Sequence, residues 1–170
     1  FITSLIMASG FVSFIFIMNG DLVTASWLIL AAMIFDFLDG FSARLLRAYS
    51  AIGKELDSLA DVVSFGVAPG LIICRLLAES LQFPQPFTLN SDSLPSFLLL
   101  CSVALMPVCA GLRLAIFNVD ETQAKSFKGL PTPANALAVI SIVFALYYSN
   151  SVISRSLTGS PAALVILTLI

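Results

Sequence analysis

The segment "DFLDGFSARLLRAYSAIGKELDSLAD", residues 36–61, decides the fold of this chain. It holds four aspartates in a chain whose residues are 59% hydrophobic and 11% charged. Soluble domains carry about 25% charged residues, so this composition indicates a protein that lies in a lipid bilayer. The carboxylates within such apolar sequence are therefore the feature to explain.

Six apolar spans are expected in the 170 residues, because a helix needs about 20 residues to cross a bilayer. The predicted fold class is all-α, a polytopic membrane protein built as a bundle of six transmembrane helices. Residues 1–170 form one domain, and we expect it to be truncated at both ends, since each end lies inside an apolar run. The spans are Phe1–Met18, Leu22–Tyr49, Glu55–Ala78, Ser96–Phe117, Ala134–Tyr148 and Pro161–Ile170, the last incomplete.

The cations predict the orientation of this bundle. Arg75 and Arg155 fall at or toward one side of the membrane. The opposite side has more cations, and the positive-inside rule makes it cytoplasmic. We therefore expect an integral protein of a prokaryotic cytoplasmic (inner) membrane. No basic run suggests a nucleic-acid partner. The cations of the cytoplasmic side are Arg44, Arg47, Lys54, Arg113, Lys125 and Lys128.

Three spans place ionisable groups at a similar depth. At a helical rise of about 1.5 Å per residue, Asp36 lies about 21 Å into its span, while Asp61 and Arg113 lie about 26 Å from the outer ends of theirs. This agreement predicts one shared polar site that faces the cytoplasm.

Carboxylates inside a membrane are costly unless they are paired, hydrated or bound to a cation. Asp36 and Asp39 are neighbours on one helix face, as are Asp57 and Asp61 on another. A salt-bridge network with the nearby arginines is one interpretation. The favoured one is a pair of hard divalent cations, Mg²⁺ or Mn²⁺, which take oxygen ligands and can clamp a phosphoryl group. The chain has no histidine, which excludes histidine nucleophile triads and histidine metal sites.

Small residues follow the aspartates at Gly40, Ala43 and Gly53. In membrane helices such residues often serve close packing. They would equally leave a bare helix surface against which a nucleotide can lie, with Arg44 placed to meet a phosphate.

The spacing Asp36-x2-Asp39-Gly40-x2-Ala43-Arg44-x8-Gly53-x3-Asp57-x3-Asp61 resembles the motif of the CDP-alcohol phosphotransferase family at every fixed position. The resemblance implies six transmembrane helices and a cytoplasmic site with two divalent metals. It also implies transfer of a substituted phosphate from a CDP-linked donor to an alcohol with release of CMP, and a homodimer.

The resemblance also assigns roles residue by residue. It makes Asp36, Asp39, Asp57 and Asp61 the metal residues and Asp61 the general base, consistent with the need of a weakly nucleophilic alcohol for a positioned carboxylate. It assigns the binding of the CDP-linked donor to Asp39, Gly40, Ala43, Arg44 and Gly53.

Three further segments favour serine as the acceptor. "LDSLADVVSFGVAPG" (56–70), "LRLAIFNV" (112–119) and "FKGLPTPANA" (127–136) resemble the phosphatidylserine synthase branch of the family. That branch moves a phosphatidyl group from CDP-diacylglycerol to L-serine. One departure is Ile116, which stands where the branch often has arginine.

The acceptor residues are predicted from charge and position. A serine carboxylate needs a cation, and Arg113 and Lys128 are the candidates. Ser64, seven residues after Asp57, and Asn118 are weaker candidates for acceptor contacts. Arg75 is expected to reach the outer interface or a lipid headgroup.

Other functions stay open at this point. The same chemistry can use glycerol-3-phosphate or an inositol phosphate, although a phosphorylated acceptor should need more cations than this chain offers. Intramembrane carboxylates also mark ion pathways, so a divalent-cation transporter is the alternative from another class. A purely structural scaffold would leave the carboxylates unexplained.

Overall fold

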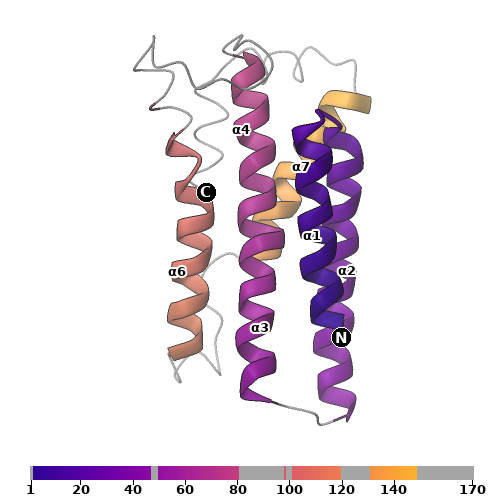
Figure 1. Ribbon diagram of the computed structural model, residues 1–170, viewed down its shortest axis with the longest axis vertical. Helices are drawn as coiled ribbons and strands as arrows, with labels where there is room; N and C mark the ends of the chain where they lie inside the picture. The colour runs from indigo at the N-terminus through magenta and orange to yellow at the C-terminus, as the bar shows by residue number, and fades with distance from the viewer. Residues whose placement is uncertain (1, 47–49, 81–97, 99–100, 120–130, 149–170) are drawn as a thin grey trace.

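The computed structural model describes residues 2–46, 50–80, 98, 101–119 and 131–148, and every regular element in these ranges is helical (Figure 1). This agrees with the predicted all-α class. The segments 82–95 and 120–130, with Lys128, and the expected span Pro161–Ile170 lie outside the described residues.

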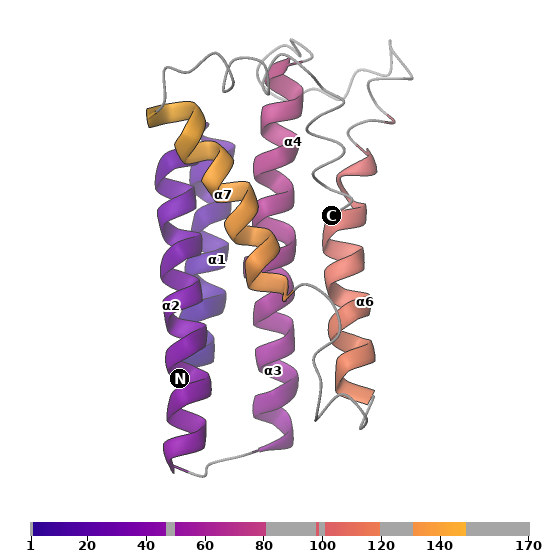
Figure 2. The ribbon, with the colours of Figure 1, turned by 180° about the vertical axis from the view of Figure 1, so that it is seen from behind.

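The chain begins with two antiparallel helices, α1 (Ile2–Met18) and α2 (Leu22–Leu46), which lie side by side in both views (Figures 1 and 2). A tight turn at residues 19–21 joins them. Gly20 has a positive φ of 83°, its N–H donates to Ile17, and the Asp21 N–H donates to Phe16. These two hydrogen bonds form a Schellman motif, which needs glycine at the left-handed position.

Asp21 also begins α2. Its carboxylate accepts the Thr24 N–H at 3.0 Å, as helix-capping aspartates do. Hydrogen bonds from the Thr24 side chain and backbone hold the pKa of this carboxyl below its ordinary value. One three-residue turn therefore closes α1 and caps α2.

A long rod made of three helical segments forms the middle of the molecule (Figure 1). Its parts are α3 (Ala51–Asp61), the π-helix η1 (Val62–Val67) and α4 (Ala68–Ser80). The wide π turn immediately precedes Pro69, whose ring would clash with the Phe65 carbonyl in a regular α-helix. Because Ser50 caps α3, the rod starts before the predicted Glu55.

The fourth predicted span, Ser96–Phe117, is not continuous in its described part. The helical residues Cys101 and Ser102 are followed by a turn at 103–104, and α6 runs over Leu105–Val119. Pro107 has no N–H to donate to the Val103 carbonyl, so the helix restarts with the proline in its first turn, where proline is tolerated. The helix of the fifth predicted span, α7, covers Thr132–Tyr148 and likewise has Pro133 in its first turn.

Small residues let the helices approach closely, as is common in membrane proteins. A Cβ on Gly10 of α1 would lie 2.3 Å from the Ser64 Oγ of η1, and one on Gly66 would lie 3.1 Å from the Ala110 Cβ of α6. The rod is thus in contact with α1 on one flank and α6 on the other (Figures 1 and 2). Fully buried side chains between the helices include Ile6, Ile29, Phe65, Ile72, Ile73, Leu77, Val139 and Ile140.

Two stretches of the described chain are long and apolar enough to cross a membrane by length and composition, namely Leu22–Leu45 and Ile52–Ser80. The other three apolar helices are shorter. Large apolar side chains such as Phe11, Trp27 and Phe37 are more than half exposed. Such side chains suit a lipid environment better than water.

Candidate metal centre and the pocket beside it

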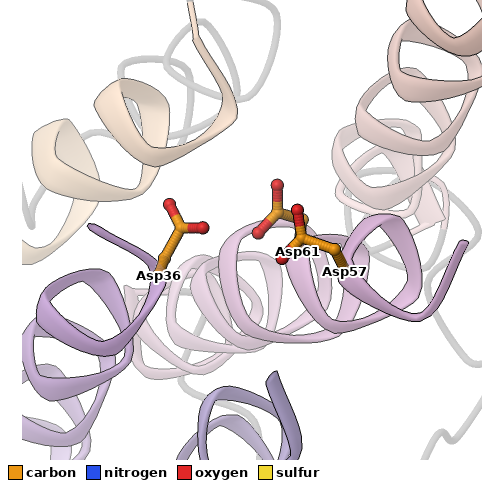
Figure 3. A group of neighbouring side chains, drawn as sticks. All are labelled: Asp36, Asp57 and Asp61. Atoms are coloured by element: carbon orange, nitrogen blue, oxygen red, sulfur yellow. The ribbon is translucent and has the colours of Figure 1, made fainter. Parts of the chain in front are cut away.

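Three of the four motif aspartates come together where α2 faces α3 (Figure 3). Asp36 extends from α2 toward Asp57 and Asp61, which lie one turn apart on α3. One carboxylate oxygen from each of the three lies within 4.8 Å of the others. The two pairs of aspartates predicted from their spacing therefore face each other through at least one member of each pair.

These carboxylates have the properties of cation ligands. The Oδ1 atoms of Asp57 and Asp61 are buried and accept no hydrogen bond within the described chain. A buried, unpaired acceptor is costly, and three like charges at this spacing repel one another. A hard divalent cation would satisfy these oxygens, so the three side chains fit Mg²⁺ or Mn²⁺.

Asp39 is not a member of this three-carboxylate group, although it lines the same pocket as Asp57. It is partly buried and accepts a hydrogen bond from the Thr3 hydroxyl of α1. The fourth aspartate therefore has a protein partner, and its role as a metal ligand stays a prediction.

A pocket of about 290 Å³ adjoins the carboxylates and is lined from three helices, α1, α2 and α3. Asp57 belongs both to the pocket and to the three-carboxylate group. Every residue that the motif assigns to donor binding lines this pocket. Within the part of the chain that the structure describes, the lining residues are Thr3, Asp39, Gly40, Ala43, Arg44, Ser50, Gly53, Lys54 and Asp57.

The two motif glycines serve different purposes in the pocket wall. A Cβ on Gly40 would meet no atom of the described residues within 4 Å, so this glycine does not serve packing against the described helices and leaves open space beside Asp39. A Cβ on Gly53 would lie 2.7 Å from the Ser50 Oγ, which accepts the Gly53 N–H at 2.9 Å. Gly53 therefore permits the serine cap that begins α3 at the pocket.

Sequence reasoning missed three lining residues, Thr3, Ser50 and Lys54. The sequence did carry a signal for Ser50, because a serine ahead of a helical pattern is a capping signature. Lys54 was noted only as a cytoplasmic cation, and nothing in the sequence connects Thr3 with residues 36–61 so far along the chain.

The predicted acceptor residues have separate surroundings. Ser64 is fully buried and donates to the Ile6 carbonyl at 3.0 Å, so it contributes to the packing of η1 against α1. Asn118 donates through its side-chain amide to Ser58 Oγ at 2.9 Å. Arg113 is partly buried on α6, and Lys128 lies outside the described residues. Their contacts with an acceptor stay predictions.

Two other residues noted in the sequence are placed by the structure. Ile116 is 60% exposed on α6, so its side chain is not part of the buried core. Arg75 forms an ion pair with Glu79 on the next turn of α4, with its Nε 3.1 Å from the carboxylate.

The sequence is similar to those of known proteins. A family model described as CDP-alcohol phosphatidyltransferase matches residues 1–170. The chain is 38% identical over 148 residues to the CDP-diacylglycerol–serine O-phosphatidyltransferase of Mycobacterium leprae, covering 83% of this chain and 44% of that protein.

Two more relatives are similar at the same level. The CDP-diacylglycerol–serine O-phosphatidyltransferase of Bacillus subtilis is 34% identical, over 68% of this chain and 58% of its own length. The archaetidylserine synthase of Methanothermobacter thermautotrophicus is 34% identical, over 84% of this chain and 56% of its own length. The chain thus spans about half the length of these curated relatives. No solved structure shows significant similarity to it.

Proposed function

The chain belongs to the CDP-alcohol phosphatidyltransferase family, and we propose that it transfers a phosphatidyl group from CDP-diacylglycerol to the hydroxyl of L-serine. The products are phosphatidylserine and CMP. The observation that carries this proposal is the pocket beside the three-carboxylate group, because its lining contains all five residues that the family motif assigns to the donor.

The pocket offers open space and a cation to the diphosphate of a nucleoside diphosphate. Gly40 leaves open space in the wall, and Arg44 presents a guanidinium to phosphate oxygens. In this proposal Asp39, Gly40, Ala43, Arg44 and Gly53 contact the donor.

The carboxylates provide the reaction centre. Asp36, Asp57 and Asp61, with Asp39 beside them, hold two divalent cations, Mg²⁺ or Mn²⁺. When bound, these cations stabilise negative charge on the phosphate oxygens during transfer. The buried oxygens of Asp57 and Asp61 that accept no hydrogen bond from the described chain support this role.

Asp61 acts as the general base of the transfer. The serine oxygen forms a bond to the phosphorus that carries the diacylglycerol, and the hydroxyl proton moves to the Asp61 carboxylate. The bond from that phosphorus to the CMP oxygen breaks, and CMP leaves.

Serine is favoured as the acceptor by the names of the three relatives, each of which includes serine. We assign the acceptor site to Arg113 and Lys128 for the serine carboxylate, with Ser64 and Asn118 as weaker contributors. Glycerol-3-phosphate and inositol phosphate bring additional negative charge, and the described pocket lining offers two cations, Arg44 and Lys54.

The chain forms one transmembrane domain in this proposal. Its six helices span a prokaryotic inner membrane, the pocket opens to the cytoplasm, and the protein is a homodimer. Arg44 and Lys54, both in the pocket lining, belong to the side of the chain that is rich in cations, which supports this orientation.

The proposal is tested by measuring CMP release by the purified protein with CDP-diacylglycerol and Mn²⁺ or Mg²⁺. Parallel reactions contain L-serine, glycerol-3-phosphate, inositol or inositol phosphate. We expect release with serine alone. Release with a different acceptor would retain the donor site and refute the serine assignment, whereas metal flux into liposomes without any CMP release would favour the transporter.

A further inference from the structure

We propose that Lys54 is a second phosphate-binding cation of the pocket, alongside Arg44, and that the C-terminal end of α6 positions it. The family motif does not include Lys54. The inference rests on the proposed function, because the phosphate in question is the diphosphate of the CDP-linked donor.

The first observation is the distribution of charge around the pocket. Among the described residues, its lining contains two carboxylates, Asp39 and Asp57, and two cations, Arg44 and Lys54. Arg44 lies near the end of α2 and Lys54 in the first turn of α3. The two cationic residues therefore line the pocket from different helices. A diphosphate carries more than one negative charge and has oxygens that two such donors can share.

The second observation is a closed set of hydrogen bonds that joins α3 to α6. The Lys54 Nζ donates to the backbone carbonyl of Asn118 at 3.4 Å. The Asn118 side-chain amide donates to the Ser58 Oγ at 2.9 Å, and Ser58 Oγ donates to the Lys54 carbonyl at 3.1 Å. The Asn118 carbonyl thus contacts the Lys54 ammonium directly, and the other two hydrogen bonds hold this part of α3 against the end of α6.

This arrangement prepares Lys54 for an anionic ligand. An ammonium group has three N–H donors, so the long bond to Asn118 leaves the others for phosphate oxygens. A flexible lysine normally loses rotamer freedom when it binds, and holding it beforehand reduces this cost. In this inference Asn118, near the C-terminal end of α6, positions the Lys54 ammonium.

The test is calorimetric titration of the full chain with CDP, and in parallel with cytidine, in the presence of Mn²⁺. Lys54→Ala should weaken CDP binding roughly tenfold or more, as expected for a lost hydrogen bond to a charged group. Cytidine has no phosphate, so its affinity should stay within about twofold of the unmodified chain. Lys54→Arg should retain most of the CDP affinity because it keeps the charge.

Glu55→Gln provides the matched control. Glu55 is the next residue along α3, is exposed and does not line the pocket. Its substitution should leave the affinities for both CDP and cytidine unchanged, which would show that charge changes near the start of α3 are not sufficient to weaken binding.

The positioning role has its own measurement. Ser58→Ala and Asn118→Ala should each weaken CDP binding less than Lys54→Ala does. Adding Ser58→Ala to Lys54→Ala should cause no further loss, because both act through the same ammonium group. A double variant whose effect is the sum of the two single effects would refute the positioning role.

The remaining outcomes separate this inference from the proposed function. If the unmodified chain binds CDP and Lys54→Ala binds it equally well, the inference is wrong and the donor site stands. If Lys54→Ala weakens CDP and cytidine equally, the contact is not to phosphate and the inference is also wrong. If the unmodified chain binds no CDP, the proposed function itself is refuted.

Discussion

The hydroxyl of Thr3 donates a hydrogen bond to the carboxylate of Asp39, and this bond joins the first turn of α1 to α2 at the wall of the pocket. Thr3 is buried, with 7% of its surface exposed. The contact orients one of the two carboxylates in the described pocket lining, because an aspartate held by a buried donor cannot rotate freely.

Thr3→Val should therefore weaken the donor site without unfolding the protein. Valine has nearly the same shape but cannot donate a hydrogen bond, and such bonds to charged groups contribute about 1.5–3 kcal/mol. We expect the KM for CDP-diacylglycerol to rise roughly tenfold or more, while the KM for serine changes little. Thr3→Ser keeps the hydroxyl and is the control; equal effects of the two substitutions on this KM would contradict the role of the bond.

Asp61→Asn should abolish CMP release while the fold is retained. Asparagine has the same shape but cannot take the serine proton, and it is a much weaker cation ligand than a carboxylate. Positioned acid–base groups contribute about 10²–10⁴-fold to rates, so turnover should fall at least that far. Helical content by circular dichroism and elution as a single species would show that the variant is folded, and turnover equal to that of the unmodified chain would refute the catalytic assignment.

Removal of divalent cations should also stop the reaction, and Asp57→Asn should change the amount of metal that restores it. Asp57 belongs to both the three-carboxylate group and the pocket. After chelation, we expect activity to return with Mg²⁺ or Mn²⁺, and Asp57→Asn to need a higher concentration for half-maximal rate. Full activity in excess chelator would exclude a metal-dependent reaction at these carboxylates.

Much of the site was readable from the sequence because its residues are close together in the chain. The motif spacing correctly grouped Asp36 with Asp57 and Asp61, and Gly40 with Arg44 and Gly53. The helical periodicity of the sequence could not identify Thr3 as a pocket residue, because Thr3 contacts Asp39 only through tertiary packing.

The helix type and boundaries show a second limit of prediction from sequence, because backbone hydrogen bonds decide them. Ser64 lies seven residues after Asp57, a spacing that puts two residues on one face of a regular α-helix, whereas Val62–Val67 is a π-helix with i→i+5 hydrogen bonds. Ser64 consequently faces Ile6 of α1. Likewise, the hydrophobic run through Pro107 reads as one span, although the missing N–H of the proline divides it.

The two glycines Gly40 and Gly10 should respond oppositely to substitution by alanine. At Gly40 a Cβ would meet no atom within 4 Å in the described part of the chain, and alanine favours a helix over glycine by up to about 1 kcal/mol. Gly40→Ala should keep or raise the melting temperature yet weaken CDP binding, because the methyl group occupies space in the pocket wall.

Gly10→Ala should instead destabilise the fold. Its Cβ would lie 2.3 Å from Ser64 Oγ, so α1 and η1 would have to separate. Overpacking of this kind costs about 1–3 kcal/mol. Adding Ser64→Ala should recover part of the lost stability, because it removes the Ser64 Oγ. The recovery should be incomplete, because the Ser64 Cα and Cβ remain 3.0 Å from the new atom.

The prediction for Gly40 has its own contradicting outcome. A Gly40→Ala variant with unchanged CDP affinity would show that the open space at this position is not used by the ligand.

The acceptor site is tested through Arg113, which lies partly buried on α6. If its guanidinium holds the serine carboxylate, Arg113→Ala should raise the KM for serine more than the KM for CDP-diacylglycerol. Charged hydrogen bonds of about 1.5–3 kcal/mol correspond to a tenfold or larger change. Arg113→Lys should recover part of the affinity, because it restores the charge without the planar fork that matches a carboxylate. Lys128→Ala, measured in the same way, distinguishes the contributions of Arg113 and Lys128 to serine binding. Equal increases in both KM values for Arg113→Ala would indicate a role in holding α6 in place, and the serine carboxylate would then have to be assigned to Lys128 alone.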